Sequence, residues 1–286
     1  MPDYLTLIKE KKQDWATLDK RMGVDADMAR LKKYVMKDSY DHIVPDIINV
    51  TLNKPAVFAA NIISALDGAS QQTIVESENR RVDTAYIEEF QKAAFNSADY
   101  RLRKQPGQVD LNKYADIQLC LRGRTARRVL FRDEGGILIP EITPWDGRYV
   151  YYEADTQGIV WAGYETRRSK TQIQAEYSVT INGKDAQVLD VWDAQHNEIW
   201  IEGRKHIEQV HEYGFVPIII EIVNLGYGRV LLDSNRIEHE GESIFFLIRD
   251  LIPELNRLAT ILQTLNLKAV QPPMKQKRKG GGEPSA

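Results

Sequence analysis

The sequence has little cysteine and no long hydrophobic run. Cys120 is the only cysteine among 286 residues, so we expect no internal disulfide and no thiolate cluster for a structural zinc ion. The longest nearly apolar run, from Ala56 to Leu66, is shorter than the roughly 20 residues that a membrane-spanning helix needs. A run of charged residues begins at Lys9, where a secretory signal would be apolar. We therefore expect a soluble protein of a reducing compartment, or one part of a larger assembly, without membrane contact.

The sequence also lacks a basic excess and the common catalytic motifs. Its 38 Lys and Arg residues and 41 Asp and Glu residues give a net charge of −3, so any nucleic-acid contact must be local. It contains no Gly-x-x-x-x-Gly-Lys-Ser/Thr phosphate loop, no Gly-x-Ser-x-Gly elbow and no His-Glu-x-x-His zinc motif. The five histidines are scattered, and His206 and His211 would face opposite sides of a strand. We expect no enzyme, no bound metal and no cofactor.

Residues 1–124 have the apolar spacing of helices. Apolar residues recur every three to four positions from Asp3 to Lys20, and Gly23 should end this first helix. Asp25 or Asp27 is placed to cap a second helix, which would continue to Val35. The further elements predicted here are a strand over Val44–Leu52, a helix from Pro55 to Gly68, a strand over Thr73–Glu76, a helix that follows Asp83, and a helix from Asp110 to Leu121.

Residues 125–240 alternate short β-branched and aromatic runs with turn signals. A spacing of about ten residues per strand predicts an antiparallel sheet or a small sandwich. Asn182-Gly183 suits a two-residue hairpin turn because both residues accept positive φ. One helical turn is expected between Ser169 and Glu176. The predicted strands are Ala126–Phe131, Ile137–Ile142, Arg148–Glu153, Ile159–Glu165, Tyr177–Ile181, Val188–Asp193, Glu198–Glu202 and His206–Tyr213.

Three groups of charged residues have a functional and a simpler interpretation. Asp146, Glu153 and Asp155 could supply the acid and base of a hydrolase, or only occupy turns and solvent-facing positions. The basic stretch Arg122–Arg132 could contact phosphate or a neighbouring subunit, or form local ion pairs. The tail from Gln271 could touch a nucleic-acid backbone, or only keep the chain soluble. Its four candidate residues for DNA proximity are Lys275, Lys277, Arg278 and Lys279.

The most apolar helical segment is 241–270. Its large apolar residues recur at helical spacing and cover more than one face, so other segments or neighbouring subunits should bury them. Pro253 lies inside the pattern and should kink or restart the helix. Four leucines are the candidates for packing between subunits: Leu255, Leu258, Leu262 and Leu265.

The order of these segments resembles that of the portal proteins of tailed double-stranded DNA phages, also called head-to-tail connectors. The likeness covers most of residues 40–275 and is one of pattern and order. It rests on Asn49–Phe58 leading into an apolar helix, a helical pair, then Ile142–Tyr152, Gly158–Tyr164, His211–Ile220 and Leu251–Leu265.

The resemblance implies an α+β fold, in which a mainly helical wing domain with an antiparallel β insert is followed by a long stem helix. The helical part of the wing would be 1–124, its β part 125–240, the stem helix 241–270, and a flexible basic tail 271–286. Portals continue into a clip, a second stem helix and a crown, so we expect the chain to be truncated.

The resemblance also implies a virion protein that hydrolyses nothing. About a dozen copies would form a ring at one capsid vertex, after assembly in the host cytoplasm. Double-stranded DNA would pass through it non-specifically during packaging and ejection, and terminase, the major capsid protein and head-completion proteins would be its partners. A mildly acidic body suits a conduit because tight phosphate contacts would hold the duplex. The alternatives are the hydrolase above and another virion structural protein, from a tail or an adaptor.

Overall fold

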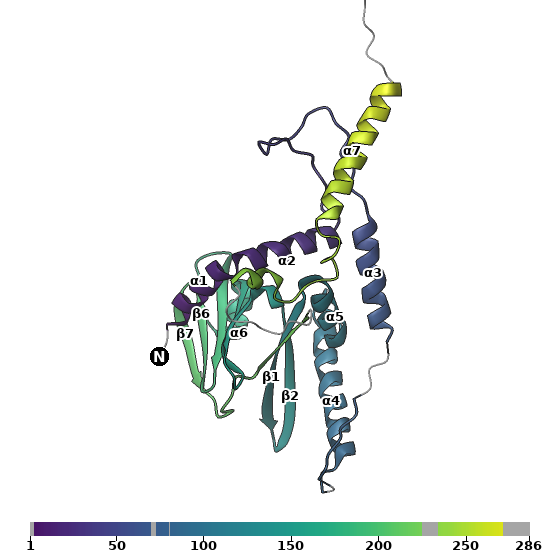
Figure 1. Cartoon of the computed structure of the whole chain (residues 1–286). Helices are drawn as coiled ribbons and strands as arrows, with labels where there is room; N and C mark the ends of the chain where they lie inside the picture. Colours follow the sequence, from purple (N-terminus) through teal and green to yellow (C-terminus); the bar gives the residue numbers. More distant parts are fainter. Residues whose placement is uncertain (1–2, 70–72, 80, 225–233, 271–286) are drawn as a thin grey trace, which may run out of the picture.

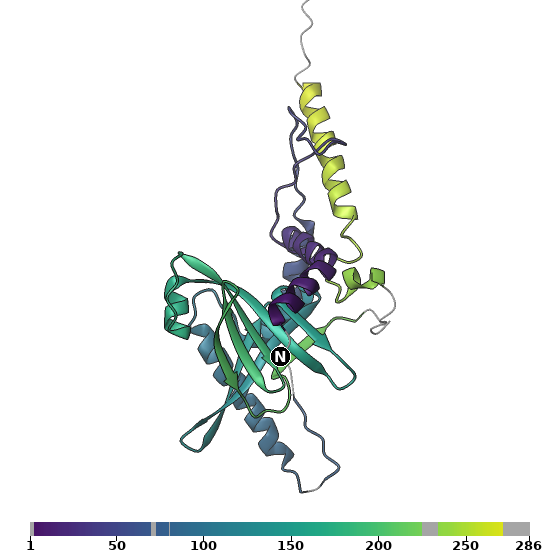
Figure 2. The same cartoon turned by 90° about the vertical axis from the view of Figure 1, so that its left-hand side faces the viewer.

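A computed structural model describes residues 3–69, 73–79, 81–224 and 234–270. Within these ranges the chain is α+β, with seven α-helices and two antiparallel sheets (Figures 1 and 2). The α-helices are α1 (Tyr4–Asp14), α2 (Ala16–Ala29), α3 (Lys54–Asp67), α4 (Thr84–Arg103), α5 (Leu111–Arg122), α6 (Lys170–Tyr177) and α7 (Leu251–Val270), and the 3-10 helices are η1 (Gly147–Tyr149) and η2 (Ser234–His239).

The strands form two sheets of different size. The smaller sheet has the order β2-β1-β8, and the larger is a meander in the order β3-β4-β5-β6-β7. Neighbours pair antiparallel throughout, as short connections allow. The strands are β1 (Arg124–Glu134), β2 (Ile137–Trp145), β3 (Val150–Ala154), β4 (Ile159–Ser169), β5 (Asp185–Asp193), β6 (His196–Ile201), β7 (Arg204–Val210) and β8 (Ile218–Ile222).

One apolar core joins α1 and α2 to both sheets. Trp15, between the two helices, packs edge-on against Tyr152 of β3 with ring centroids 5.2 Å apart, and Leu18 and Met22 of α2 are fully buried. Two smaller cores lie around Ile173 of α6 and where α4 and α5 meet β2. Helices from the first part of the chain therefore share their main core with strands from the second part.

Several predicted helix ends are confirmed. Pro55 lies in the first turn of α3, where its missing N–H breaks no helical hydrogen bond, and the helix ends at Gly68. The Asp83 side chain accepts the N–H of Tyr86 and so caps α4, and Gly123 ends α5 with a φ of 74°. These signals act within one turn, which is why the sequence alone locates them. The helical turn expected after Ser169 is α6, whose N-terminus carries a capping box.

The predicted boundaries of the first two helices are wrong. The break falls at Trp15, and Gly23 lies inside α2 although a helical glycine costs about 1 kcal/mol relative to alanine. Burial of the surrounding residues of α2 outweighs that cost. Asp25 and Asp27 are helical and cap nothing, and the helix ends at Ala29 without continuing to Val35.

Three predicted strands and one predicted hairpin turn are wrong as well. Val44–Leu52 joins neither sheet and bends at Pro45 and Asp46, where Asp46 has a φ of 55°, and the described residues around Thr73–Glu76 form no strand. Tyr177–Ile181 is not a strand because α6 runs to Tyr177 and Ser178 then takes a left-handed conformation with φ 57°. Asn182-Gly183 consequently lies between α6 and β5 and makes no hairpin turn. β-Branched composition favours extended backbone without specifying a partner strand.

The last helix stands apart from the rest. In Figures 1 and 2, α7 (yellow) projects beyond the sheets, and the segment between α2 and α3 runs beside it. The helix predicted over 241–270 is shorter than expected, because residues 244–250 form turns and α7 begins at Leu251. Pro253 lies in its first turn, so the proline marks the start of the helix and not a kink within it.

Candidate assembly interface on helix α7

α7 directs its polar side toward its own chain. Beyond its first turn the buried residues are Asn256, Thr260 and Thr264, which share one face because they are four residues apart. Residues 47–52, which we call the extended segment, lie against this face (Figures 1 and 2). Among the described residues, the side of α7 that is covered is thus its polar side.

Three hydrogen bonds join the extended segment to α7, and we call them the ladder. The N–H groups of Ile48, Val50 and Leu52 donate to Thr264 Oγ1 (3.1 Å), Thr260 Oγ1 (2.9 Å) and Asn256 Oδ1 (2.9 Å), respectively. Four helical residues rise about 6.0 Å and two extended residues about 6.6 Å, so the two spacings stay in step over three bonds. The ladder thereby uses backbone donors that a sheet would otherwise have paired.

The other side of the extended segment is hydrogen-bonded to the residues that directly follow α2. Residues 31–53, which we call the arm, leave α2 and return to α3. Within the arm, the N–H of Met36 donates to Asn49 Oδ1 and that of Tyr34 to Thr51 Oγ1, each at 2.8 Å. Side chains rather than a β ladder therefore hold the arm together, apart from one isolated bridge between Lys37 and Ile43. The strand predicted over Val44–Leu52 is therefore wrong at its start, where Asp46 is left-handed, and the residues after it pair with α7 and not with a strand.

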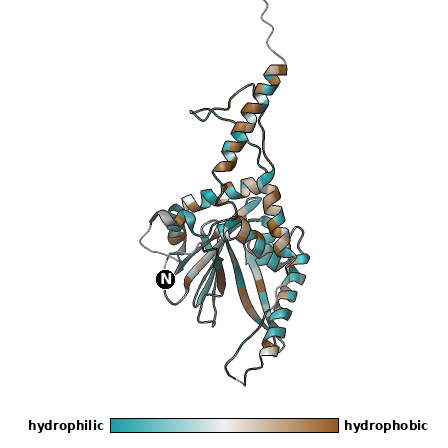
Figure 3. Ribbon diagram, turned by 45° about the vertical axis from the view of Figure 1, so that its right-hand side comes forward, coloured by the Kyte–Doolittle hydropathy of each residue, from teal (hydrophilic) through white to brown (hydrophobic). Residues whose placement is uncertain are grey.

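The leucine side of α7 faces away from its own chain. The four leucines predicted to pack between subunits are all exposed: Leu255 47%, Leu258 57%, Leu262 62% and Leu265 58%. With Leu251 they follow a 4-3-4-3 spacing, the a/d pattern of a coiled-coil seam. Figure 3 shows the apolar residues along this helix in brown. The structure brings the four leucines to one face; their packing between copies stays a prediction.

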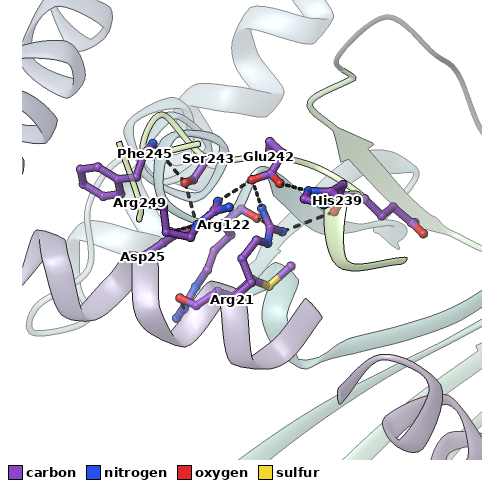
Figure 4. A network of polar contacts seen from close by, with 10 residues as sticks. Arg21, Asp25, Arg122, His239, Glu242, Ser243, Phe245 and Arg249 are labelled. Carbon is purple, nitrogen blue, oxygen red and sulfur yellow. Dashed lines mark hydrogen bonds and ion pairs between the residues drawn. The ribbon is translucent and has the colours of Figure 1, made fainter. Parts of the chain in front are cut away.

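A buried network of charges joins α2 to residues 242–252, which we call the root of α7 (Figure 4). Arg249 donates to Asp25 Oδ1 at 2.7 Å and also to Glu242, while Arg21 donates to Glu242 Oε2 at 2.8 Å. Ser243 Oγ adds a hydrogen bond to Asp25 at 2.7 Å. Two arginines and two carboxylates balance in charge, and this balance with additional hydrogen bonds is what makes buried ions tolerable.

The network shifts the pKa values of its members in opposite directions. Burial is the largest influence on Glu242 and raises its pKa, but hydrogen bonds from Arg249 and His239 and the charge of Arg21 together hold the pKa below its ordinary value. Burial lowers the pKa of Arg249, yet its bonds to Asp25 and Glu242 raise it above the usual value for arginine. Both shifts favour the charged forms of Glu242 and Arg249, whereas burial lowers the pKa of Arg21 although the charge of Glu242 opposes this.

Gly123, at the end of α5, and Gly241, just before the charge network, are in close backbone contact. A Cβ on Gly123 would lie 2.0 Å from the carbonyl oxygen of Gly241, and a Cβ on Gly241 would lie 2.4 Å from that of Gly123. Both glycines have a φ of 74°. The N–H of Ile244 donates to the Cys120 carbonyl at 3.0 Å close by. The end of α5 and the approach to α7 therefore touch backbone to backbone, and this contact allows no side chain.

The three carboxylates considered for a hydrolase have separate partners. Asp146 accepts from Arg122 at 3.3 Å and from the N–H of Arg148, which caps η1. Glu153 pairs with Lys11 of α1, and Asp155 accepts the backbone N–H groups of its own turn. Among the interactions of the described residues, none links one of these carboxylates to another. Each has the local role that the simpler interpretation assigns to it.

The basic stretch splits between buried and paired positions. Arg124 is 1% exposed, and its guanidinium lies 4.8 Å from the centroid of the Trp15 ring. Arg128 and Arg132 both pair with Glu141 of β2, and Arg127 pairs with Glu221 of β8. These pairs agree with the simpler interpretation of local ion pairing.

The remaining sequence predictions concern the tail cations, a metal site, a membrane span and the histidines. Lys275, Lys277, Arg278 and Lys279 lie outside the described residues. Within the described ranges, no group of three His, Cys, Asp or Glu side chains is placed to hold a metal ion. In the same ranges, no helix combines the length and the apolarity needed to cross a bilayer. His211 instead contacts the Asp193 carbonyl at 3.1 Å.

Sequence reasoning missed the ladder and the charge network. An Asn-x-x-x-Thr-x-x-x-Thr pattern inside a leucine-rich helix is a signal for a polar face, and it could have been read from residues 256–264. No comparable signal connects Arg21 with Glu242, which are 221 positions apart. No family model matches the chain, and no curated protein matches it either.

Proposed function

We propose that the chain is a structural subunit that assembles into a ring around a conduit for double-stranded DNA, as a portal subunit of a tailed phage. The observation that carries this proposal is the orientation of α7. Its polar face is bonded to the chain's own arm, and its leucine face is exposed. A large contiguous apolar face is a mark of an interaction site.

Burying the exposed leucines in one contact releases too little free energy for stable assembly, so several contacts must combine. Leu251, Leu255, Leu258, Leu262 and Leu265 are 47–62% exposed. Covering them removes roughly three leucine side chains from water, which contributes on the order of 4–8 kcal/mol. Association costs about 4–15 kcal/mol in lost freedom, so one such contact is marginal. A closed ring gives every copy two contacts, which favours a ring over an isolated pair.

The width of the apolar face agrees with two neighbours. At 100° per residue, the side chains from Ile261 round to Leu255 span about 120° of the helix circumference. A strict coiled-coil seam is narrower. Helices standing side by side in a ring need such a face because each contacts a copy on either side.

In this proposal α7 is the stem and residues 1–240 are the wing. The ring would occupy one capsid vertex of the virion, after assembly in the host cytoplasm, and would serve as the platform for terminase and for the major capsid and head-completion proteins. DNA would pass through without sequence-specific contact, which a net charge of −3 favours. The cations at Lys275, Lys277, Arg278 and Lys279 remain the prediction for DNA proximity.

Native mass spectrometry at micromolar concentration tests the proposal. We expect a species of about a dozen times the 32.8 kDa chain mass. Leu258→Glu combined with Leu262→Glu should dissociate it, because a ring would bury these charges. Gln263→Glu on the exposed flank of α7 is the matched control and should leave the species intact. A wild-type chain that is strictly monomeric under these conditions would reject the proposal.

A further inference from the structure

A groove of 410 Å³ opens between the start of α3 and the root of α7. Pro55, Val57 and Phe58 line it from α3, and Ile248 and Ile252 line it from the root of α7. Its lining is largely apolar, and Val57 and Phe58 remain 47% and 42% exposed. The groove is therefore a place where the described part of the chain leaves apolar side chains uncovered.

Two protruding leucines lie immediately beside this groove. Leu247 is 82% exposed and Leu251 is 60% exposed. They directly precede Ile248 and Ile252 in the sequence, and hydrogen bonds from Arg249 to Phe245 and from Ile252 to Ile248 give this stretch a helical path. Successive residues on such a path point about 100° apart. The root of α7 thus presents a groove wall on one side and a knob, formed by Leu247 and Leu251, on the adjacent side.

The knob and the groove carry opposite charges. Asp250 lies between the two leucines and is exposed, and Lys54 lines the groove and is exposed. Within the described part of the chain, neither residue has an ion-pair partner. An apolar knob with a carboxylate complements an apolar groove with an ammonium group in both shape and charge.

Ring symmetry determines which surfaces can meet. Rotation about a ring axis leaves the height of every atom along that axis unchanged, so a knob can enter a neighbour's groove only if both lie at the same height. Each knob leucine directly precedes a groove residue, so if the path of residues 247–252 runs along the ring axis, knob and groove differ in height by only about 1.5 Å. Because they are different surfaces, their contact is head-to-tail and can repeat around a closed ring.

We propose that Leu247 and Leu251 of one copy enter the groove between α3 and the root of α7 in the next copy, with Asp250 facing Lys54. The inference rests on the proposed ring and specifies which surfaces of two copies touch. This contact lies at the base of the leucine face of α7, so the same neighbouring copy would cover the groove and the leucine face.

A charge swap tests the electrostatic half of the contact. Lys54→Glu and Asp250→Lys each place like charges together, and each should raise the subunit concentration needed for assembly by about two- to tenfold. The double variant restores opposite charges and should return to the wild-type concentration. Lys54→Glu adds a negative charge to the first turn of α3, where it favours the helix, so lost assembly would not report a lost fold. Circular dichroism checks the fold of each variant.

Disulfide trapping tests the geometry independently. In the double variant Leu247→Cys/Phe58→Cys, oxidation should link each copy to the next and produce a ladder of covalent oligomers on a non-reducing gel. The single variants are the controls and should give no ladder, because Cys120 is buried. Products that stop at dimers, or no products from a chain that still forms a ring, would overturn this contact and leave the ring proposal intact. A monomeric wild-type chain would instead overturn the ring, and this contact with it.

Discussion

Replacing Thr260 with valine tests whether the ladder holds the arm to α7. Thr260 is fully buried, and its hydroxyl accepts the N–H of Val50 at 2.9 Å. Valine has nearly the same shape, so the substitution removes the acceptor without opening a cavity. Because Val50 is only partly buried, loss of this hydrogen bond should cost about 0.5–1.5 kcal/mol, which corresponds to roughly 2- to 13-fold in an equilibrium constant. We therefore expect the Val50 amide of the variant to exchange its hydrogen with solvent faster by that factor.

Hydrogen exchange followed by NMR measures this change residue by residue. The matched variant Thr264→Val should move the largest effect from Val50 to Ile48, because each threonine accepts from a different amide. Asn266→Ala, at an exposed position of α7 outside the ladder, should leave both amides protected. Unchanged protection of Val50 in Thr260→Val would refute the ladder. An equal loss across the β-sheets would show that the hydroxyl stabilises the whole fold and not the arm.

Three further predictions concern the root of α7. Arg249→Met leaves two buried carboxylates without their main partner. The free energy of unfolding, measured by thermal denaturation, should therefore fall by about 3–5 kcal/mol. Gly123→Ala should destabilise the chain strongly, since the new Cβ would meet a carbonyl oxygen at 2.0 Å, whereas Gly135→Ala has open space and should cost only about 1 kcal/mol for its positive φ. Because the pKa of Glu242 lies below its ordinary 4.5, its contribution is present above pH 4.5 and is lost as the pH falls through the folded-state pKa. Urea unfolding midpoints between pH 7 and pH 3 should thus depend less on pH in Glu242→Gln than in the wild type.

The network and the ladder together give α7 a defined orientation before any partner arrives. The network holds the root at Arg249 and Glu242, and the ladder holds the helix as far as Thr264. A face that is already ordered loses less freedom on association than a flexible one. This preorganisation supports an assembly role for the leucine face, because a marginal apolar contact becomes useful when little ordering remains to be done.

The sequence by itself determined the features whose causes lie within a few residues. Asp83 caps α4 and Gly123 ends α5 because each acts on the adjacent turn. The leucine spacing of α7 was equally readable, since helical periodicity places those side chains on one face whatever the surroundings. The alternation of strands and turns likewise predicted antiparallel sheets, although not which segments would remain unpaired.

Tertiary structure decided the features that depend on a distant partner. Gly23 remains helical because α2 is buried around it, and Ile48–Leu52 is extended without a sheet because α7, some 210 residues later, accepts its N–H groups. The charge network exists only when Arg21 of α2 meets Glu242 near the end of the chain. Periodicity showed that α7 has an apolar face, but only the folded chain showed that its own arm binds the opposite, polar face. The physical reason is that a hydrogen-bond donor or a charge can be satisfied by many partners, and the fold selects among them.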